Sequence, residues 1–218
     1  MRTKKNIVVL GGSFAPITKA HMNLILSSCE QLNARGILVP SSDEYVLRKL
    51  RRKKTPHAEF YASYSECRSP ALHAILQEMD PERDYIEISH YELKQRKCSG
   101  HTLETLDYLA AQNEDSQIYF IMGAEKLKTF RKWKTADELL FHYPIVVAAG
   151  QGKEPEDEIN TWFPEQKDRF VILTAFEDMD NISSTDVRTF VGFDYYTGVA
   201  HFTCKQTADF LKDHFNMR

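Results

Sequence analysis

Residues 11–21 combine glycine, hydroxyl and imidazole groups in an order that suits a phosphate ligand. Gly11 and Gly12 follow an apolar run, and their lack of a Cβ lets backbone N–H groups approach a ligand closely. Thr18 and His21 are three residues apart at a predicted helix start, so they share one face of its first turn. The free N–H groups and the dipole at a helix N-terminus favour an anion. A lone histidine there is more often structural, but the glycines and Thr18 favour a site where His21 stabilises charge on a transferring phosphoryl group.

A second group of polar residues lies near the C-terminus, in the run Ile-Ser-Ser-Thr-Asp-Val-Arg of residues 182–188. The hydroxyls of Ser183, Ser184 and Thr185 precede Arg188 by about one helical turn, which would form another anion-binding helix start. An N-cap followed by a surface arginine explains the same pattern. Because this run follows a predicted strand, we expect it at the same sheet edge as His21, where two such sites would suit a polyphosphate.

Three further features could contact a ligand, although each also has a purely structural explanation. Gly123 and Glu125 follow a predicted strand, and Glu125 could contact a nucleotide or merely complement a helix dipole. Thr102 and Thr105 share a face early in a predicted helix, where capping is the alternative. Trp133 could shape a base pocket or anchor the core.

A basic run occupies residues 48–54, inside a stretch from 41 to 56 that we predict to be a loop over the sheet. Residues 150–158 are rich in Gly, Glu and Pro and predict a second, exposed loop. A charged run is usually a solvated surface. Next to a phosphate site it could also screen a polyphosphate or close over it.

The chain lacks the motifs of several other chemistries. It has no pair of carboxylates placed for acid–base catalysis, no H-x-x-x-H metal motif, no G-x-S-x-G turn and no G-x-x-x-x-G-K-[ST] loop. Backbone amides, His, Arg, Lys and hydroxyls without a protein base suit nucleotidyl transfer between phosphates, because the attacking phosphate oxygen is already anionic. Catalysis would then consist of alignment and charge stabilisation, with Mg²⁺ held mainly by the phosphates of the nucleotide and no protein metal site.

The composition indicates a soluble cytoplasmic protein. The 218 residues are 42% hydrophobic, and the net charge of −3 argues against a nucleic-acid partner. No apolar run approaches the length of a membrane span, so no membrane association is expected. The four cysteines show no metal-type pairing, which favours a reduced, intracellular protein. A homo-oligomer is compatible with the sequence.

Short apolar runs alternate with helical patterns along the chain, which predicts an α/β protein with a doubly wound parallel sheet. The predicted strands are residues 6–11, 36–40, 84–89, 117–122, 144–149 and 170–174. The predicted helices are residues 18–34, 57–79, 101–113, 124–132, 135–142, 183–191 and 203–215. Ligands of such sheets bind beyond the carboxyl ends of the strands, where the strand order reverses. We expect residues 1–218 to form a single domain, with an α/β core over 1–180 and a small helical part over 181–218.

Residues 11–21 and 182–188 together closely resemble the nicotinate/nicotinamide mononucleotide adenylyltransferases. These enzymes belong to the nucleotidyltransferase superfamily, which carries an H/T-x-x-H site and a distal I-S-S-T-x-x-R motif. Residues 100–106 are similar to the Y-T-x-x-T-L segment of the family, residues 120–133 to its G-A-D…W segment, and residues 42–45 to the N-D-x-Y stretch of the eukaryotic branch. The resemblance thus covers most of the chain and implies a Rossmann-like nucleotidyltransferase fold.

The resemblance also implies roles for individual residues. The substrates would be ATP and a pyridine mononucleotide, whose phosphate attacks the α-phosphorus of ATP, yielding a dinucleotide of the NAD biosynthetic pathway and pyrophosphate. The implied catalytic residues are Thr18, His21 and Arg188. The residues implied to bind ATP are Gly12, Ser13, Phe14, Gly123, Glu125, Ser184 and Thr185, and those implied to face the mononucleotide are Tyr45, Thr102 and Trp133.

The chain departs from the family pattern at a few positions. Thr18 replaces the first histidine of H-x-x-H, as in the eukaryotic branch, and Glu125 replaces an aspartate. Residues 149–151 lack the arginine of bacterial members, and residues 56–58 lack the lysine of their P-H-K stretch. Two alternatives therefore stay open: a superfamily member with another nucleotide or phosphate acceptor, and a nucleotide-binding regulator whose catalysis has decayed.

Overall fold

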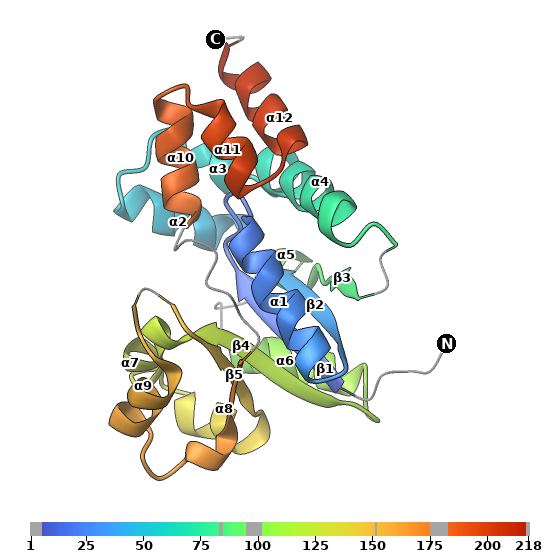
Figure 1. The fold of residues 1–218 in the computed structure, drawn as a ribbon, viewed down its shortest axis with the longest axis vertical. Helices are drawn as coiled ribbons and strands as arrows, with labels where there is room; N and C mark the ends of the chain where they lie inside the picture. Colours follow the sequence, from blue (N-terminus) through green and yellow to red (C-terminus); the bar gives the residue numbers. More distant parts are fainter. Residues whose placement is uncertain (1–5, 83–84, 95–101, 151, 175–182, 217–218) are drawn as a thin grey trace.

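A parallel six-stranded sheet forms the centre of the computed structural model, which describes residues 6–82, 85–94, 102–150, 152–174 and 183–216 (Figure 1). The strand order is β3-β2-β1-β4-β5-β6. The strands are β1 (Asn6–Gly12), β2 (Ala34–Pro40), β3 (Ile86–Ile88), β4 (Gln117–Gly123), β5 (Ile145–Ala148) and β6 (Phe170–Ile172). All six predicted strands are therefore confirmed, because a strand buried on both faces reads as a continuous apolar run.

The order in which strands are added to the sheet reverses between β1 and β4. From β1 the chain adds β2 and then β3 on one side, and it then returns to add β4, β5 and β6 on the other. Val9 in β1 pairs with Ile37 in β2 and with Phe120 in β4, so β1 is hydrogen-bonded on both edges. The carboxyl ends of β1 and β4, at Gly12 and Gly123, flank this switch point, where doubly wound sheets bind their ligands.

Helices cover both faces of the sheet. Alternate residues of β1 point to opposite faces, so that Ile7 and Val9 join one apolar core while Val8 and Leu10 join the other. The first core is closed by α6 (Thr102–Ala111), α7 (Leu127–Phe130), α8 (Ala136–His142) and α9 (Pro155–Trp162), and the second by α1 (Lys19–Gln31) and α4 (Ser69–Met79). No described helix is long and apolar enough to cross a membrane.

The C-terminal helices form a third layer at one end of the molecule. These are α10 (Ser184–Gly192), α11 (Tyr196–Phe202) and α12 (Lys205–Asn216), and they lie beside α2 (Asp43–Arg52), α3 (Ala58–Ala62) and α4 (Figure 1). Val46 and Leu50 of α2 share a buried cluster with Val187, Val199 and Leu211 of these helices. The predicted helical C-terminal part is thus present, and it packs on the segment that follows β2.

The prediction of a loop over residues 41–56 is wrong, because α2 occupies most of it. The Ser42 hydroxyl accepts a hydrogen bond from the Tyr45 N–H (3.4 Å), and Asp43 lies in the first turn, where the helix dipole favours an acid. Val46 and Leu50, four residues apart, are buried on one face. The many charges on the other faces of this helix conceal its short apolar stripe.

Other boundaries also differ from the prediction. The predicted helix over 57–79 is divided into α3, a π-helical turn (Tyr64–Arg68) and α4. The predicted exposed stretch 150–158 contains the start of α9, whose first residue, Pro155, suits a first helical position. Two short helices, α5 (Tyr91–Lys94) and α11, were not predicted.

Candidate active site

The loop after β1 is folded tightly around the Phe14 ring. Phe14 is buried and has a φ of 44°, a conformation that is rare for a bulky side chain. A Cβ added to Gly12 would lie 2.7 Å from Phe14 Cε1, so only glycine fits there. The Phe14 ring meets the His21 ring edge-on, with 5.4 Å between the centroids. Gly12 and Phe14 thereby place this loop against the start of α1.

Thr18 and His21 contact each other directly, as their spacing predicts. The backbone N–H of Thr18 lies 3.3 Å from His21 Nδ1, and the Thr18 hydroxyl lies 2.6 Å from the same nitrogen. Because a backbone amide can only donate, Nδ1 must accept and cannot carry a hydrogen. The neutral ring therefore carries its hydrogen on Nε2, which is the nitrogen available to a ligand.

His21 is held in its neutral form in this structure. Burial and, to a smaller extent, the positive charges of Lys49 and Lys126 together lower its pKa from 6.5 to about 4. A neutral imidazole at pH 7 can donate one hydrogen bond from Nε2. An arriving phosphate would oppose the effect of both lysines and favour the imidazolium.

Lys49 is a candidate site residue that the sequence indicated only as part of a basic run. Its Nζ donates a hydrogen bond to Ser13 Oγ over 2.9 Å, from α2 to the loop after β1. Burial, together with nearby cations that include Lys53, Lys126 and Arg188, lowers the pKa of Lys49 to about 8. No carboxylate forms an ion pair with Lys49 within the described part of the chain. A lysine that has cationic neighbours and no carboxylate paired to it suits a bound polyanion.

The start of α10 lies directly against the loop after β1. Ser184 Oγ donates to the carbonyl of Pro16 over 2.7 Å, and Arg188 Nη1 donates to the carbonyl of Ala15 over 2.6 Å. Arg188 Nη2 also donates to Thr185 Oγ1 over 3.0 Å. The two motifs that the sequence singled out, more than 160 residues apart, therefore meet at one place.

A capping box fixes the first turn of α10. Asp186 accepts from both the backbone N–H and the hydroxyl of Ser183, each over 2.8 Å, and Ser183 Oγ in turn accepts from the Thr185 N–H over 3.2 Å. Arg188 extends from the next turn over the ring of Tyr61, 5.8 Å from its centroid. The helix start and the guanidinium are thus both held rigidly.

Glu125 lies in the 3-10 turn (Ala124–Lys126) that follows β4, in space that two glycines leave open. A Cβ on Gly123 would lie 2.1 Å from Glu125 Oε2, and a Cβ on Gly150 would lie 2.7 Å from the same atom. Oε2 is buried and has no hydrogen-bond partner among the described residues, while Oε1 lies 3.3 Å from Lys126 Nζ. Oε2 is therefore an unpaired acceptor in the described part of the chain.

The residues expected to face a mononucleotide are more dispersed. Tyr45 lies exposed on α2 with Arg48 over its ring, Thr102 is the half-buried first residue of α6, and Trp133 is exposed beside Phe130. Within the described residues, no hydrogen bond or ring contact joins Tyr45, Thr102 or Trp133 to His21. Their assignment to a ligand stays a prediction.

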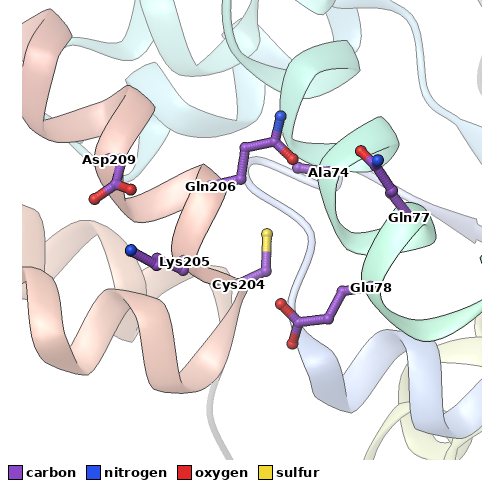
Figure 2. Close-up of a pocket in the computed structure, with 7 residues that line it drawn as sticks. All are labelled: Ala74, Gln77, Glu78, Cys204, Lys205, Gln206 and Asp209. Carbon is purple, nitrogen blue, oxygen red and sulfur yellow. The ribbon is translucent and has the colours of Figure 1, made fainter.

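A separate pocket opens between α4 and α12 (Figure 2). It is lined by Ala74, Gln77, Glu78, Cys204, Lys205, Gln206 and Asp209. It contains none of the residues that the sequence assigned to a ligand. The candidate active site is instead the surface formed by the loop after β1, the starts of α1 and α10, Lys49 and Glu125.

Comparison with known proteins places this geometry in a family. Probable nicotinate-nucleotide adenylyltransferases are similar in sequence: that of Aquifex aeolicus is 27% identical over 182 residues, covering 82% of this chain and 99% of the relative, and that of Clostridium tetani is 27% identical over 187 residues, covering 84% and 86%. The resemblance predicted from the two motifs is thus confirmed.

Solved structures show the same fold. The Plasmodium falciparum nicotinic acid mononucleotide adenylyltransferase complexed with NaAD superposes with a TM-score of 0.67 and 17% identity, covering 98% of this chain and 97% of that one. The same enzyme complexed with APC gives the same TM-score. The family model described as cytidylyltransferase-like matches residues 9–190, which contain both phosphate motifs. The chain belongs to the cytidylyltransferase-like family.

Proposed function

We propose that this protein transfers the adenylyl group of ATP to nicotinate mononucleotide, forming the dinucleotide and releasing pyrophosphate. The observation that carries the proposal is the contact of Ser184 and Arg188 with the carbonyls of Pro16 and Ala15, which joins two phosphate motifs at one sheet edge. The names of the relatives, and the NaAD complex of a protein with the same fold, support the choice of acceptor. Residues 1–218 act in this proposal as one domain, to which α10 supplies the second motif.

In the proposed reaction, an oxygen of the mononucleotide phosphate attacks the α-phosphorus of ATP. A new P–O bond forms as the bond to the β-phosphate oxygen breaks, and no proton has to be removed from the attacking group. His21 donates from Nε2 to a phosphate oxygen, while Thr18 fixes the ring through Nδ1. Arg188 and Lys49 add positive charge where negative charge accumulates.

The remaining contacts follow from where each residue lies. Gly12, Ser13 and Phe14 would meet the ATP phosphates from the loop after β1, and Ser184 and Thr185 would meet them from the start of α10. Gly123 and Glu125 would lie beside the adenosine. The side chains of Tyr45, Thr102 and Trp133 would face the mononucleotide.

Enzymes of this kind generally use a divalent metal together with ATP. The donors gathered here are N–H groups, cations and hydroxyls, which suit phosphate oxygens rather than a metal ion. Across the described ranges no three His, Cys, Asp or Glu residues are grouped as a metal site. We therefore propose that Mg²⁺ is bound through the nucleotide phosphates, where it neutralises part of their charge. A cytoplasmic location suits an enzyme that consumes ATP.

A substrate screen tests this function. The purified chain is incubated with ATP and Mg²⁺ and with nicotinate mononucleotide, nicotinamide mononucleotide or unrelated phosphomonoesters, and pyrophosphate release and dinucleotide formation are measured. We expect turnover with a pyridine mononucleotide, and none after chelation of Mg²⁺ with EDTA. If nicotinate mononucleotide gives no rate above background, the assignment falls.

The same screen separates the alternative functions. Turnover with CTP, or only with another acceptor, would indicate a different nucleotidyltransferase. Calorimetric ATP binding without pyrophosphate release on any acceptor would indicate a nucleotide-binding regulator.

A further inference from the structure

Arg68 is a fully buried arginine that joins four segments around the candidate active site. Its Nε donates to the carbonyl of Ala62 over 2.9 Å. Its Nη1 donates to the carbonyls of Ser13 (3.1 Å) and Ser41 (2.7 Å), and Nη2 donates to the carboxylate of Asp43. The planar guanidinium thus has a partner for each of its three nitrogens.

Two of the four partners, Ser13 and Asp43, belong to the segments that carry the candidate phosphate site. Ser13 lies in the loop after β1, Ser41 directly follows β2, and Asp43 begins α2, the helix that carries Lys49. Asp43 is held a second time, because its Oδ2 accepts from the Tyr64 N–H over 3.1 Å. Arg68 is therefore bonded both to the loop that presents Ser13 and to the helix that presents Lys49.

We propose that Arg68 is a positioning residue, which fixes α2 against the loop after β1 so that Lys49 stays within hydrogen-bond distance of Ser13. The inference rests on the proposed function, because it assigns Lys49 to the phosphates of the substrates. Arg68 reaches none of the reacting atoms in this proposal. Its effect on catalysis passes through the position of Lys49.

The chemistry of arginine explains why this residue type is needed. One guanidinium presents donors in a fixed plane, so it can hold three carbonyls and a carboxylate at set directions simultaneously. A lysine has a single ammonium group and cannot span these partners. The Ser13 carbonyl also needs such support, because the next residue, Phe14, has a positive φ.

A double-mutant cycle tests the inference without removing the buried arginine. Asp43→Asn keeps the shape and the acceptor oxygen but loses the charge that holds Arg68, and the side chain of Asp43 is 53% exposed. It is combined with Lys49→Met. The matched control is Glu44→Gln, which removes a charge from the same first turn of α2 at an exposed position.

We expect Asp43→Asn to lower kcat/KM about tenfold when Lys49 is present, since small displacements of a positioning group are costly. In the Lys49→Met background, Asp43→Asn should lower kcat/KM by less than about twofold, because the group that Arg68 positions is gone. Glu44→Gln should leave kcat/KM unchanged in both backgrounds. Circular dichroism and the melting temperature report whether each variant is folded.

Two results would overturn the inference. One is an equal loss from Asp43→Asn with and without Lys49, which is what a general structural effect predicts. The other is a folded Asp43→Asn variant with full activity. Arg68→Lys, which keeps the charge, should reproduce the loss and its dependence on Lys49 if it folds. The dissociation constant of ATP is measured for the same set of variants. If the wild-type protein shows no turnover, the proposed function is refuted, but the ATP affinities still show whether the effect of Asp43→Asn depends on Lys49.

Discussion

Lys49 on α2 donates a hydrogen bond from Nζ to the hydroxyl of Ser13, over 2.9 Å, across the space between α2 and the loop after β1. Lys126 and Arg188 are close enough to lower the pKa of Lys49. Like charges at short range are unfavourable in the free protein. In the proposed function, the negative charge of a bound polyphosphate would offset this repulsion, and the free protein would be less stable than without Lys49.

Replacement of Lys49 by methionine should make the free protein more stable and the enzyme less active. Methionine keeps the apolar stem and removes the charge, and we expect a gain on the order of 2 kcal/mol at pH 7. A gain of this size corresponds to a melting temperature about 5 °C higher. The value of kcat/KM should fall. Lys53→Met, an exposed charge removed at the end of the same helix, should give a smaller gain.

The stability gained by Lys49→Met should depend on pH in a predictable direction. Below pH 8 the amine is charged in both the folded and unfolded states, so the penalty of holding the charge in the folded protein is fully present. Between about pH 8 and 10.5 the folded protein releases the proton first, and the penalty disappears. The advantage of Lys49→Met should therefore shrink over this range in chemical denaturation series. A constant advantage would show that the gain has another cause.

His21→Asn should abolish most of the catalytic activity and leave the fold intact. Asparagine can still accept from the Thr18 N–H but does not place a donor where Nε2 lies. Loss of one such donor typically lowers kcat by about 10²–10³-fold. The measurement is pyrophosphate release at saturating ATP, with the melting temperature as the control for folding. Near-normal release would remove His21 from the mechanism.

The lowered pKa of His21 also predicts that the folded protein becomes less stable in acid. Its pKa is about 4 in the folded protein and 6.5 when the chain is unfolded, so between these values only the unfolded chain takes up the proton. Stability should thus fall as the pH falls from 6.5 to 4, by on the order of 2 kcal/mol from this residue. Urea unfolding at about pH 7, 6 and 5 should show a shallower decline for His21→Asn. Parallel declines would mean that the ring is not protected from protonation.

The strands could be predicted from sequence because their apolar runs reflect burial on both faces. The Thr18–His21 contact could be predicted for a similar reason, since three residues within one helical turn fix the geometry locally. α2 was missed because only Val46 and Leu50 mark its buried face.

The contacts between segments distant in the chain could not be predicted from the sequence. Lys49 could not be separated from its basic neighbours until the position of α2 showed which of them reaches Ser13. Arg68 gave no signal at all, because its role comes from carbonyl groups, and every residue has one. Residue types reveal local motifs, whereas backbone partners appear only in the folded chain.

Gly150 should be needed for the binding of ATP because of the carboxylate beside it. An alanine methyl at this position would lie 2.7 Å from Glu125 Oε2 and displace it, so Gly150→Ala should raise the KM for ATP about tenfold. In a Glu125→Asp background, where the side chain is one methylene shorter, Gly150→Ala should raise the KM for ATP by less than about twofold. Gly192→Ala is the control, because an added Cβ there meets nothing within 4 Å. An unchanged KM in Gly150→Ala would separate Glu125 from the nucleotide.

The contact between Ser184 and Pro16 has a consequence for the order in which the protein matures during synthesis. The loop after β1 leaves the ribosome early, but Ser184 and Arg188, which contact it, are made more than 160 residues later. A nascent chain that has already formed β1 to β6 therefore cannot yet grip a triphosphate from both sides. In the proposed function, the complete triphosphate site therefore exists only after α10 has docked, late in synthesis.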